Sequence, residues 1–83
     1  MSSFDKQDTQ KKVVQLVADG LNVGVDAIAD HVRFEDLGAD SLDMVQIIMK
    51  LEEQFGMEIN DEDAEKMQSL SDIVNYVHVR RTQ

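Results

Sequence analysis

Apolar residues recur at spacings of three and four in several segments of this chain, and this spacing restricts the fold more than any other feature. It places apolar side chains on one face of an α-helix, whereas a half-buried β-strand would need strict alternation. The chain has 83 residues and no cysteine, so neither a disulfide nor a cysteine-based metal site can support a small core. We therefore expect an all-α fold whose amphipathic helices bury their apolar faces against one another.

The first helix is predicted to begin between Phe4 and Thr9 and to stop at Gly20. A long connection over residues 22–40 follows, and its length is typical of a functional loop. Apolar side chains should pin this loop across the helices: Val23, Val25, Ile28, Val32, Phe34 and Leu37.

The second helix is predicted over residues 41–55, with Gly56 as the residue that ends it. Met44 and Ile47 flank its expected apolar stripe, which consists of Leu42, Val45, Ile48, Leu51 and Phe55.

A short third helix over residues 60–67 should have an Asn or Asp cap, and the last helix should begin near Ser69 with Asp72 in a capping box. The core face of the last helix should contain Leu70, Ile73, Val74 and Val77. The prediction is a small four-helix bundle, three main helices plus a short third one, with a long loop between the first and second. We expect one domain over residues 1–83, frayed over residues 1–8 and with a tail over residues 80–83.

The net charge of −9 is concentrated in one part of the chain. Residues 35–65 contain eleven acidic residues and a single base, Lys50, which leaves the remainder with a net charge of +1. This field disfavours nucleic acid and anionic membrane surfaces and favours basic proteins as partners, although acid could also serve solubility alone. With no apolar run of membrane-spanning length and no signal-like N-terminus, we expect a cytoplasmic monomer without stable membrane insertion.

Ser41 is the most informative polar residue, because it lies between an aspartate and the start of an acidic, apolar-periodic helix. Its hydroxyl can cap that helix and still point to solvent, and a helix N-terminus favours a phosphate. No sequence signature brings either histidine, His31 or His78, to this serine, and both are expected on the surface. Ser41 is therefore either an ordinary helix cap or a residue that another enzyme modifies, and we expect no catalytic residue.

Residues 35–43 (Glu-Asp-Leu-Gly-Ala-Asp-Ser-Leu-Asp), followed by the blocks at 51–56 and 61–66, resemble the attachment region of acyl carrier proteins of the fatty-acid-synthesis type. The resemblance extends from about Val13 to about Val77. In that family the serine hydroxyl is esterified to 4′-phosphopantetheine, whose thiol carries acyl groups as thioesters. The resemblance implies that Ser41 carries this arm.

The resemblance also implies that Asp40 and Leu42 flank the serine for recognition by a phosphopantetheinyl transferase. It implies a docking surface for the basic surfaces of fatty acid synthesis enzymes, formed by Asp43, Met44, Gln46, Ile47, Glu52 and Glu53. It implies an acyl pocket between the second, third and fourth helices, for which we predict Ile48, Leu51, Ile59, Met67, Ile73 and Tyr76.

The chain departs from the family pattern at several positions. Arg33 stands where an apolar residue is common, and Gln46 where glutamate is common. Asn60 replaces a frequent proline before the third helix.

Two other functions stay open at this point: a polyketide, peptidyl or D-alanyl carrier, and an acidic helical adaptor that is never modified. We expect no metal site. The acids from Asp61 do not form an EF-hand loop, because its sixth position would be Lys66 instead of glycine.

Overall fold

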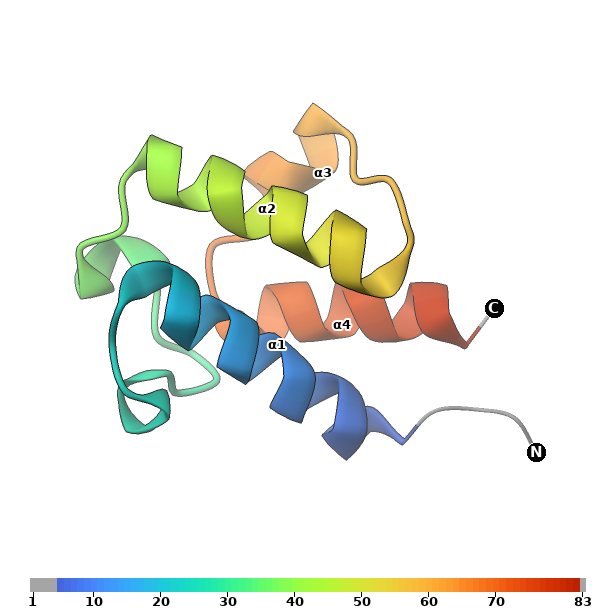
Figure 1. Cartoon of the computed structure of the whole chain (residues 1–83), viewed down its shortest axis with the longest axis horizontal. Helices are drawn as coiled ribbons and strands as arrows, with labels where there is room; N and C mark the ends of the chain where they lie inside the picture. Colours follow the sequence, from blue (N-terminus) through green and yellow to red (C-terminus); the bar gives the residue numbers. More distant parts are fainter. Residues whose placement is uncertain (1–4, 83) are drawn as a thin grey trace.

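The computed structural model describes residues 5–82 and confirms the predicted all-α fold. Four α-helices and two short 3₁₀ helices follow one another: α1 (Lys6–Leu21), η1 (Val25–Ala27), η2 (Phe34–Leu37), α2 (Ser41–Phe55), α3 (Asp61–Glu65) and α4 (Leu70–Arg81). Within the described residues there is no strand, only an isolated bridge between Arg33 and Ser69. Helix α1 packs against both α2 and α4, and the short α3 lies beside α2 on its other side (Figure 1).

Every long helix and the loop contribute to one hydrophobic core. Its most deeply buried side chains, all inaccessible to solvent, include Val13 and Val17 from α1, Leu51 from α2, and Ile73 and Val77 from α4. Leu70 and Val74 join them, so the core face predicted for the last helix is confirmed.

Helix α1 starts within the predicted interval, with Asp5 as its N-cap. The predicted stop at Gly20 is wrong, because the helix continues to Leu21 and the left-handed residue after it is Asn22, with φ 58°. Gly20 has a different role. A Cβ atom at this position would lie 2.8 Å from Cγ1 of Ile47, so the glycine allows α1 to approach α2 closely.

The long loop is tied to the helices through fewer anchors than predicted. Ile28 and Phe34 are buried, whereas Val25 is 46% exposed and anchors nothing. The loop also pairs with the connection between α3 and α4, because the backbone N–H of Phe34 donates to the Gln68 carbonyl at 2.9 Å. In a second hydrogen bond between the loop and this part of the chain, the N–H of Ser71 donates to the carbonyl of Asp30 at 3.0 Å.

The face that α2 buries differs from the predicted stripe. Ile47 and Leu51 are fully buried, whereas Leu42 and Val45 are 65% and 53% exposed. Both sets have helical spacing, and the contact of Ile47 with α1 at Gly20 decides which set turns inward. The helix ends at Gly56, as predicted, in a left-handed conformation with φ 61°.

The caps of the last two helices follow the sequence prediction. Asn60 caps α3 by accepting a hydrogen bond from the N–H of Asp63 at 2.8 Å, and Ser69 and Asp72 form a capping box for α4. Helix α3 is shorter than predicted, because it ends at Glu65.

The tail predicted over residues 80–83 is too long, because Arg80 and Arg81 belong to α4. At the other end Lys6–Asp8 belong to α1, and fraying there stays a prediction; residues 1–4 and 83 lie outside the described residues. Arg81 fixes the start of α1 on the end of α4 through an ion pair with Asp8 at 3.2 Å and a hydrogen bond to Thr9 Oγ1 at 2.8 Å.

His78, predicted on the surface, is part of the same contact between α1 and α4. Its side chain is half-buried, and its Nδ1 lies 3.0 Å from Oγ1 of the fully buried Thr9. The apolar spacing of the last helix does not reveal this polar contact, because the partner threonine is 69 residues away. His31 is exposed, as predicted.

Candidate functional site

Ser41 is the first residue of α2, and its side chain is exposed. Its hydroxyl forms no hydrogen bond with any residue between 5 and 82. The expectation that Ser41 caps the helix is wrong, because the capping box belongs to Asp40 and Asp43. Asp40 Oδ1 accepts from the N–H of Asp43 at 2.9 Å, and Asp43 Oδ2 accepts from the N–H of Asp40 at 3.1 Å. The hydroxyl of Ser41 is thereby left available for chemistry.

A tight turn positions this serine. Gly38, at φ 86°, has a backbone conformation that a residue with a Cβ rarely adopts, and its N–H donates to the Glu35 carbonyl at 3.1 Å. The next N–H, that of Ala39, donates to the carbonyl of the buried Phe34 at 3.1 Å. The start of α2 is thus fixed to the core through η2, and Ser41 lies on a rigid support.

The residues around Ser41 fit an ester-linked phosphate. The N–H groups of Ser41 and Leu42 have no acceptor between residues 5 and 82, and unpaired N–H groups at a helix N-terminus favour an anion. The nearby carboxylates of Asp40 and Asp43 are held in the capping box. No group of three or more His, Cys, Asp or Glu side chains that could hold a metal occurs in the described part of the chain.

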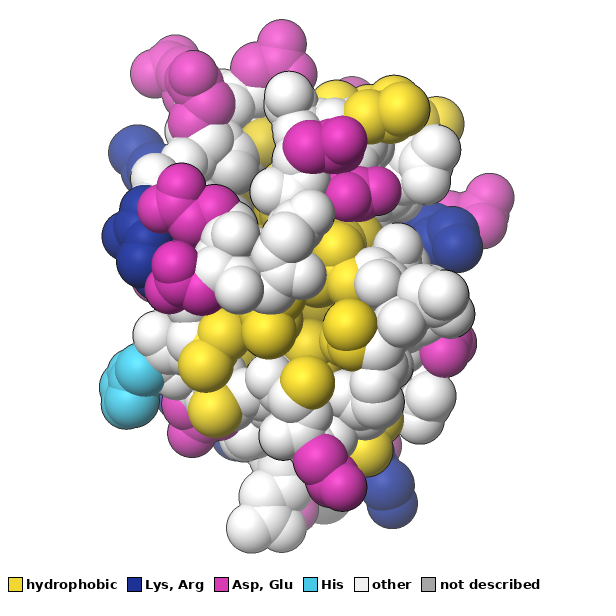
Figure 2. Space-filling model, turned by 90° about the vertical axis from the view of Figure 1, so that its left-hand side faces the viewer, with side chains coloured by type: hydrophobic (Ala, Val, Ile, Leu, Met, Phe, Trp, Pro, Cys, Tyr) yellow, Lys and Arg dark blue, Asp and Glu magenta, His cyan; other side chains and the backbone are white. Residues whose placement is uncertain are grey.

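A groove of about 770 Å³ opens beside Ser41, between α2, α3, η2 and the connection from α3 to α4. Apolar side chains supply much of its wall: Phe34, Ala39, Met44, Val45, Ile48, Met49, Ile59, Ala64 and Met67. Polar residues complete it: Arg33, Glu35, Asp40, Ser41, Glu52, Asp61, Glu65 and Gln68. On the side of the molecule where α2 begins, hydrophobic side chains are visible between acidic ones (Figure 2).

The groove contains half of the residues predicted for the acyl pocket. Ile48, Ile59 and Met67 line it, and their role toward an acyl chain stays a prediction. Leu51 and Ile73 do not, because both are fully buried in the core beneath it. No sequence pattern identifies Phe34, Ala39 and Ala64 as lining residues, since only the docking of the loop and of α3 brings them to α2.

Tyr76, also predicted for the pocket, joins α3 to α4 instead. Its hydroxyl donates to Asp63 Oδ2 at 2.9 Å and accepts from Nη2 of Arg80 at 2.6 Å, and the Arg80 guanidinium lies 4.8 Å from the ring centre. Desolvation by burial and the hydrogen bond to the Asp63 carboxylate raise the pKa of Tyr76, because both disfavour the phenolate.

The predicted docking residues of α2 differ widely in exposure. Gln46 and Glu53 are exposed, Met44 lies in the groove wall, and Ile47 is fully buried and cannot contact a partner, because it packs under α1. Glu52 is half-buried, and its Oε2 accepts from the N–H of Ile59 at 2.8 Å.

Three exposed apolar side chains of α2 were assigned no docking role from the sequence. Leu42 was predicted to flank the serine, Leu42 and Val45 were placed in the buried stripe, and Met49 was given no role. Leu42, Val45 and Met49 are 65%, 53% and 61% exposed and follow one another at helical spacing after Ser41. Their spacing could have revealed a second apolar face, had the buried face been known.

No helix among the described residues combines the length and apolar character that a membrane span requires.

Comparison with known proteins agrees with the geometry of the site. Residues 11–77 match the sequence family described as "Phosphopantetheine attachment site". The structure is similar to that of an acyl carrier protein from Enterococcus faecalis, with a TM-score of 0.76 and 30% sequence identity over 92% of this chain and 98% of that one.

The fold also resembles the HMG-ACPI domain from the CurA module of Lyngbya majuscula, with a TM-score of 0.86. At 17% identity, covering 98% of this chain and 82% of that domain, this likeness concerns the fold alone.

The family match covers most of the chain and includes the segment around Ser41. Proteins of this kind are carriers, not enzymes, and they interact with a phosphopantetheinyl transferase and with acyl-handling enzymes. The chain belongs to the acyl carrier protein family, whose prosthetic group is 4′-phosphopantetheine.

Proposed function

We propose that this chain carries growing fatty acyl chains as thioesters on 4′-phosphopantetheine attached to Ser41, and presents them to the enzymes of fatty acid synthesis in the cytoplasm. The observation that carries the proposal is the exposed hydroxyl of Ser41, which has no hydrogen-bond partner between residues 5 and 82 and lies beside a largely apolar groove.

Phosphopantetheine, when bound, supplies the thiol that this cysteine-free chain lacks. The chain's own residues prepare the attachment. The capping box between Asp40 and Asp43 holds the first turn of α2, so that the Ser41 Oγ–H stays exposed to a modifying enzyme. The oxygen of this hydroxyl would lose its proton and form the ester bond to the pantetheine-bearing phosphorus of coenzyme A, while the pyrophosphate bond at that phosphorus breaks and adenosine 3′,5′-bisphosphate leaves.

The groove would shelter the acyl chain from water. Each buried CH₂ group would contribute about 0.8 kcal/mol, and the flexible thioethers of Met44 and Met67 would adapt to chains of different shape. These residues belong to two different elements, α2 and the segment after α3, so an acyl chain between them would bridge the bundle.

Client enzymes would dock through basic surfaces. Glu53 and Gln46 are exposed on α2, and the apolar residues Leu42, Val45 and Met49 lie exposed on the same helix. Ion pairs at the rim of such a contact speed association more than they add affinity. The acidic surface would also repel other copies of the chain, which supports a monomer.

The attachment can be tested by intact mass after incubation with coenzyme A, Mg²⁺ and a broad-specificity phosphopantetheinyl transferase. The wild type should gain one phosphopantetheine, Ser41→Ala should gain none, and Ser71→Ala should behave as the wild type. Modification of Ser41→Ala, or no modification of the wild type while a known carrier is modified, would contradict the proposal and favour an unmodified acidic adaptor.

A polyketide-type carrier is the second candidate, and the likeness to the HMG-ACPI domain is the observation that favours it. The loaded protein can be offered to purified fatty acid synthesis enzymes and to a polyketide ketosynthase. Efficient, repeated elongation and reduction by the first set supports the fatty-acid type, and preference for the ketosynthase supports the second.

A further inference from the structure

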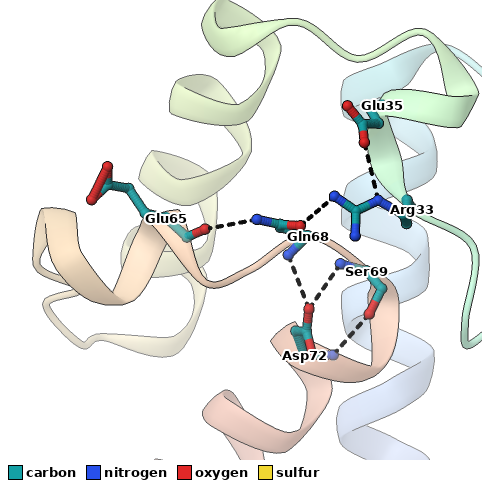
Figure 3. A network of polar contacts seen from close by, with 6 residues as sticks. All are labelled: Arg33, Glu35, Glu65, Gln68, Ser69 and Asp72. Carbon is teal, nitrogen blue, oxygen red and sulfur yellow. Dashed lines mark hydrogen bonds and ion pairs between the residues drawn. The ribbon is translucent and has the colours of Figure 1, made fainter.

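A polar connection crosses the wall of the groove at the end where the loop meets the segment after α3 (Figure 3). Nη2 of Arg33 donates to Oε1 of Gln68, and Nε2 of Gln68 donates to the backbone carbonyl of Glu65 at 3.4 Å. We call this chain of contacts the Arg33–Gln68–Glu65 relay. It joins the residue before η2 to the last residue of α3.

The middle of this relay is fixed to the body of the molecule. The carbonyl of Gln68 accepts from the N–H of Phe34 at 2.9 Å, and its N–H donates to Oδ2 of Asp72 at 3.1 Å. The neighbouring Ser69 forms the isolated bridge with Arg33. Because two hydrogen bonds hold the backbone of Gln68, its side chain contacts Glu65 from a fixed position.

The end of the relay is attached to the least firmly packed helix. Helix α3 has five residues, none of them fully buried. Its Glu65 carbonyl, at the C-terminal end, has no partner within the helix and receives one from Gln68. Among the described residues, the other hydrogen bond that holds α3 through a side chain is the one that Tyr76 of α4 donates to Asp63.

The position of the relay connects it to the groove. Arg33, Glu65 and Gln68 all line the groove, and the wall across from them is formed by side chains of α2 such as Met44 and Ile48. Widening the groove therefore requires α3 to move away from α2, and the relay opposes this movement.

We propose that Arg33 is a positioning residue that sets the acyl-chain selectivity of the groove. Through Gln68 it holds α3 in place, so that short acyl chains are sheltered more readily than long ones. This inference rests on the proposed carrier function, since selectivity needs an acyl chain on Ser41. A longer chain demands more widening, so its sheltering is opposed more strongly by any contact that breaks when α3 moves.

The contact of Arg33 with Glu35 does not explain its position equally well. This ion pair joins two side chains only two residues apart, 52% and 68% exposed, and does not reach α3. Glu35→Gln therefore serves as the control, because it weakens the ion pair and leaves the relay intact.

The fastening itself can be measured without any modification of Ser41, by hydrogen exchange of the full-length apo protein. The amides of Ala64, Lys66 and Met67 report on α3 through their backbone hydrogen bonds. Arg33→Leu and Gln68→Leu should each raise the exchange rate of these amides by roughly five-fold, as expected for one lost hydrogen bond. The double variant should add nothing further, Arg33→Lys should restore most of the protection, and Glu35→Gln should match the wild type.

The selectivity can be measured on protein loaded with octanoyl- or palmitoyl-phosphopantetheine. Cleavage of the thioester by hydroxylamine reports how well it is sheltered, and methyl NMR of Met44 and Met67, with Met57 as a reference outside the groove, reports where the chain lies. The wild type should shelter octanoyl better than palmitoyl, and Arg33→Leu should shrink that difference by roughly the same five-fold factor.

Unchanged exchange of α3 in Arg33→Leu overturns the proposed fastening. Faster exchange with an unchanged ratio of cleavage rates overturns the selectivity. Failure of Ser41 to accept the arm is a separate result: it overturns the proposed function and the selectivity with it, whereas the exchange result on the apo protein still decides whether Arg33 holds α3.

Discussion

At the scale of single residues, Gly20 shows how one missing side chain decides a helix contact. Sequence reasoning assigned it to the end of α1, because glycine commonly follows the last helical turn. In the structure it lies within the helix, and Asn22 takes the left-handed conformation. The signal was ambiguous because a glycine for close packing and a glycine for a helix end look alike in one sequence.

Gly20→Ala should therefore destabilise the fold although alanine favours helix. The new Cβ would meet Cγ1 of the fully buried Ile47 at 2.8 Å, and we expect a loss of roughly 1 kcal/mol after the gain in helix propensity is offset. Urea denaturation measures the free energy of unfolding. Gly24→Ala is the matched control, because nothing lies within 4 Å of its Cβ position. Equal stability of the two variants would mean that Gly20 is not a packing site. Ile47→Ala, which removes Cγ1, should cost less stability in the Gly20→Ala background than in the wild type.

Asp40 provides a second test at this scale. Asp40→Ala removes the acceptor for the N–H of Asp43 and should lower the unfolding free energy by about 1 kcal/mol. It should also fray the first turn of α2 around Ser41, visible as faster hydrogen exchange at Met44, whose N–H donates to the Asp40 carbonyl. Glu53→Ala, an exposed change on the same helix, should leave both quantities unchanged. A stable, protected first turn in Asp40→Ala would show that the capping box contributes nothing.

At the scale of elements, the helix ends that depend on local capping residues were predictable, whereas the buried face of α2 was not. Asn60, Ser69 and Gly56 mark ends correctly, because capping depends on residues near one another in sequence. The face of α2 was assigned wrongly because Val45 and Ile47 both belong to apolar sets with helical spacing, and only the contact with α1 distinguishes them.

The same distinction applies to the groove. Ile48, Ile59 and Met67 were named for the pocket because of the resemblance to the carrier family, and they line the groove. Phe34 and Ala64 could not, because the docking of the loop on Gln68 places them there. Local patterns indicated Ser41 as the candidate attachment residue, and contacts between distant segments determined the shape of the space beside it.

The contact between α1 and α4 makes a prediction about acid stability. The hydrogen bond from Lys12, and after it the contacts with Arg81, lower the pKa of Asp8 below its ordinary value of 3.8. Desolvation opposes part of this shift. Because the pKa of Asp8 is lower in the folded state than in the unfolded state, its carboxylate stabilises the fold above about pH 3.8. This contribution is lost as the pH falls through the folded-state pKa. Asp8→Asn should therefore flatten part of the decrease in Tm below about pH 4. Asp26→Asn is the control, because it removes an exposed carboxylate that forms no hydrogen bond or ion pair with a side chain between residues 5 and 82. An unchanged acid limb in Asp8→Asn would contradict the assignment.

At the scale of the whole molecule, charge opposes folding. The chain has a net charge of −9, and residues 35–65 account for more than all of it. Because salt at 0.1 M largely screens the repulsion between exposed charges more than about 10 Å apart, the Tm of the apo protein should rise as NaCl is added. Differential scanning calorimetry measures this directly. The variant Glu53→Gln should show a smaller rise than the wild type, and a Tm that falls with added salt would mean that attractive ion pairs outweigh the repulsion.

The start of α1 and the end of α4 lie at one end of the molecule, joined by Arg81 and Asp8, while α2 begins at the opposite end (Figure 1). An affinity handle, a fluorescent reporter or a bead linkage attached beyond either helix would therefore project away from Ser41. The bundle could be immobilised, or linked into tandem arrays, with every copy of Ser41 still accessible to enzymes supplied from solution.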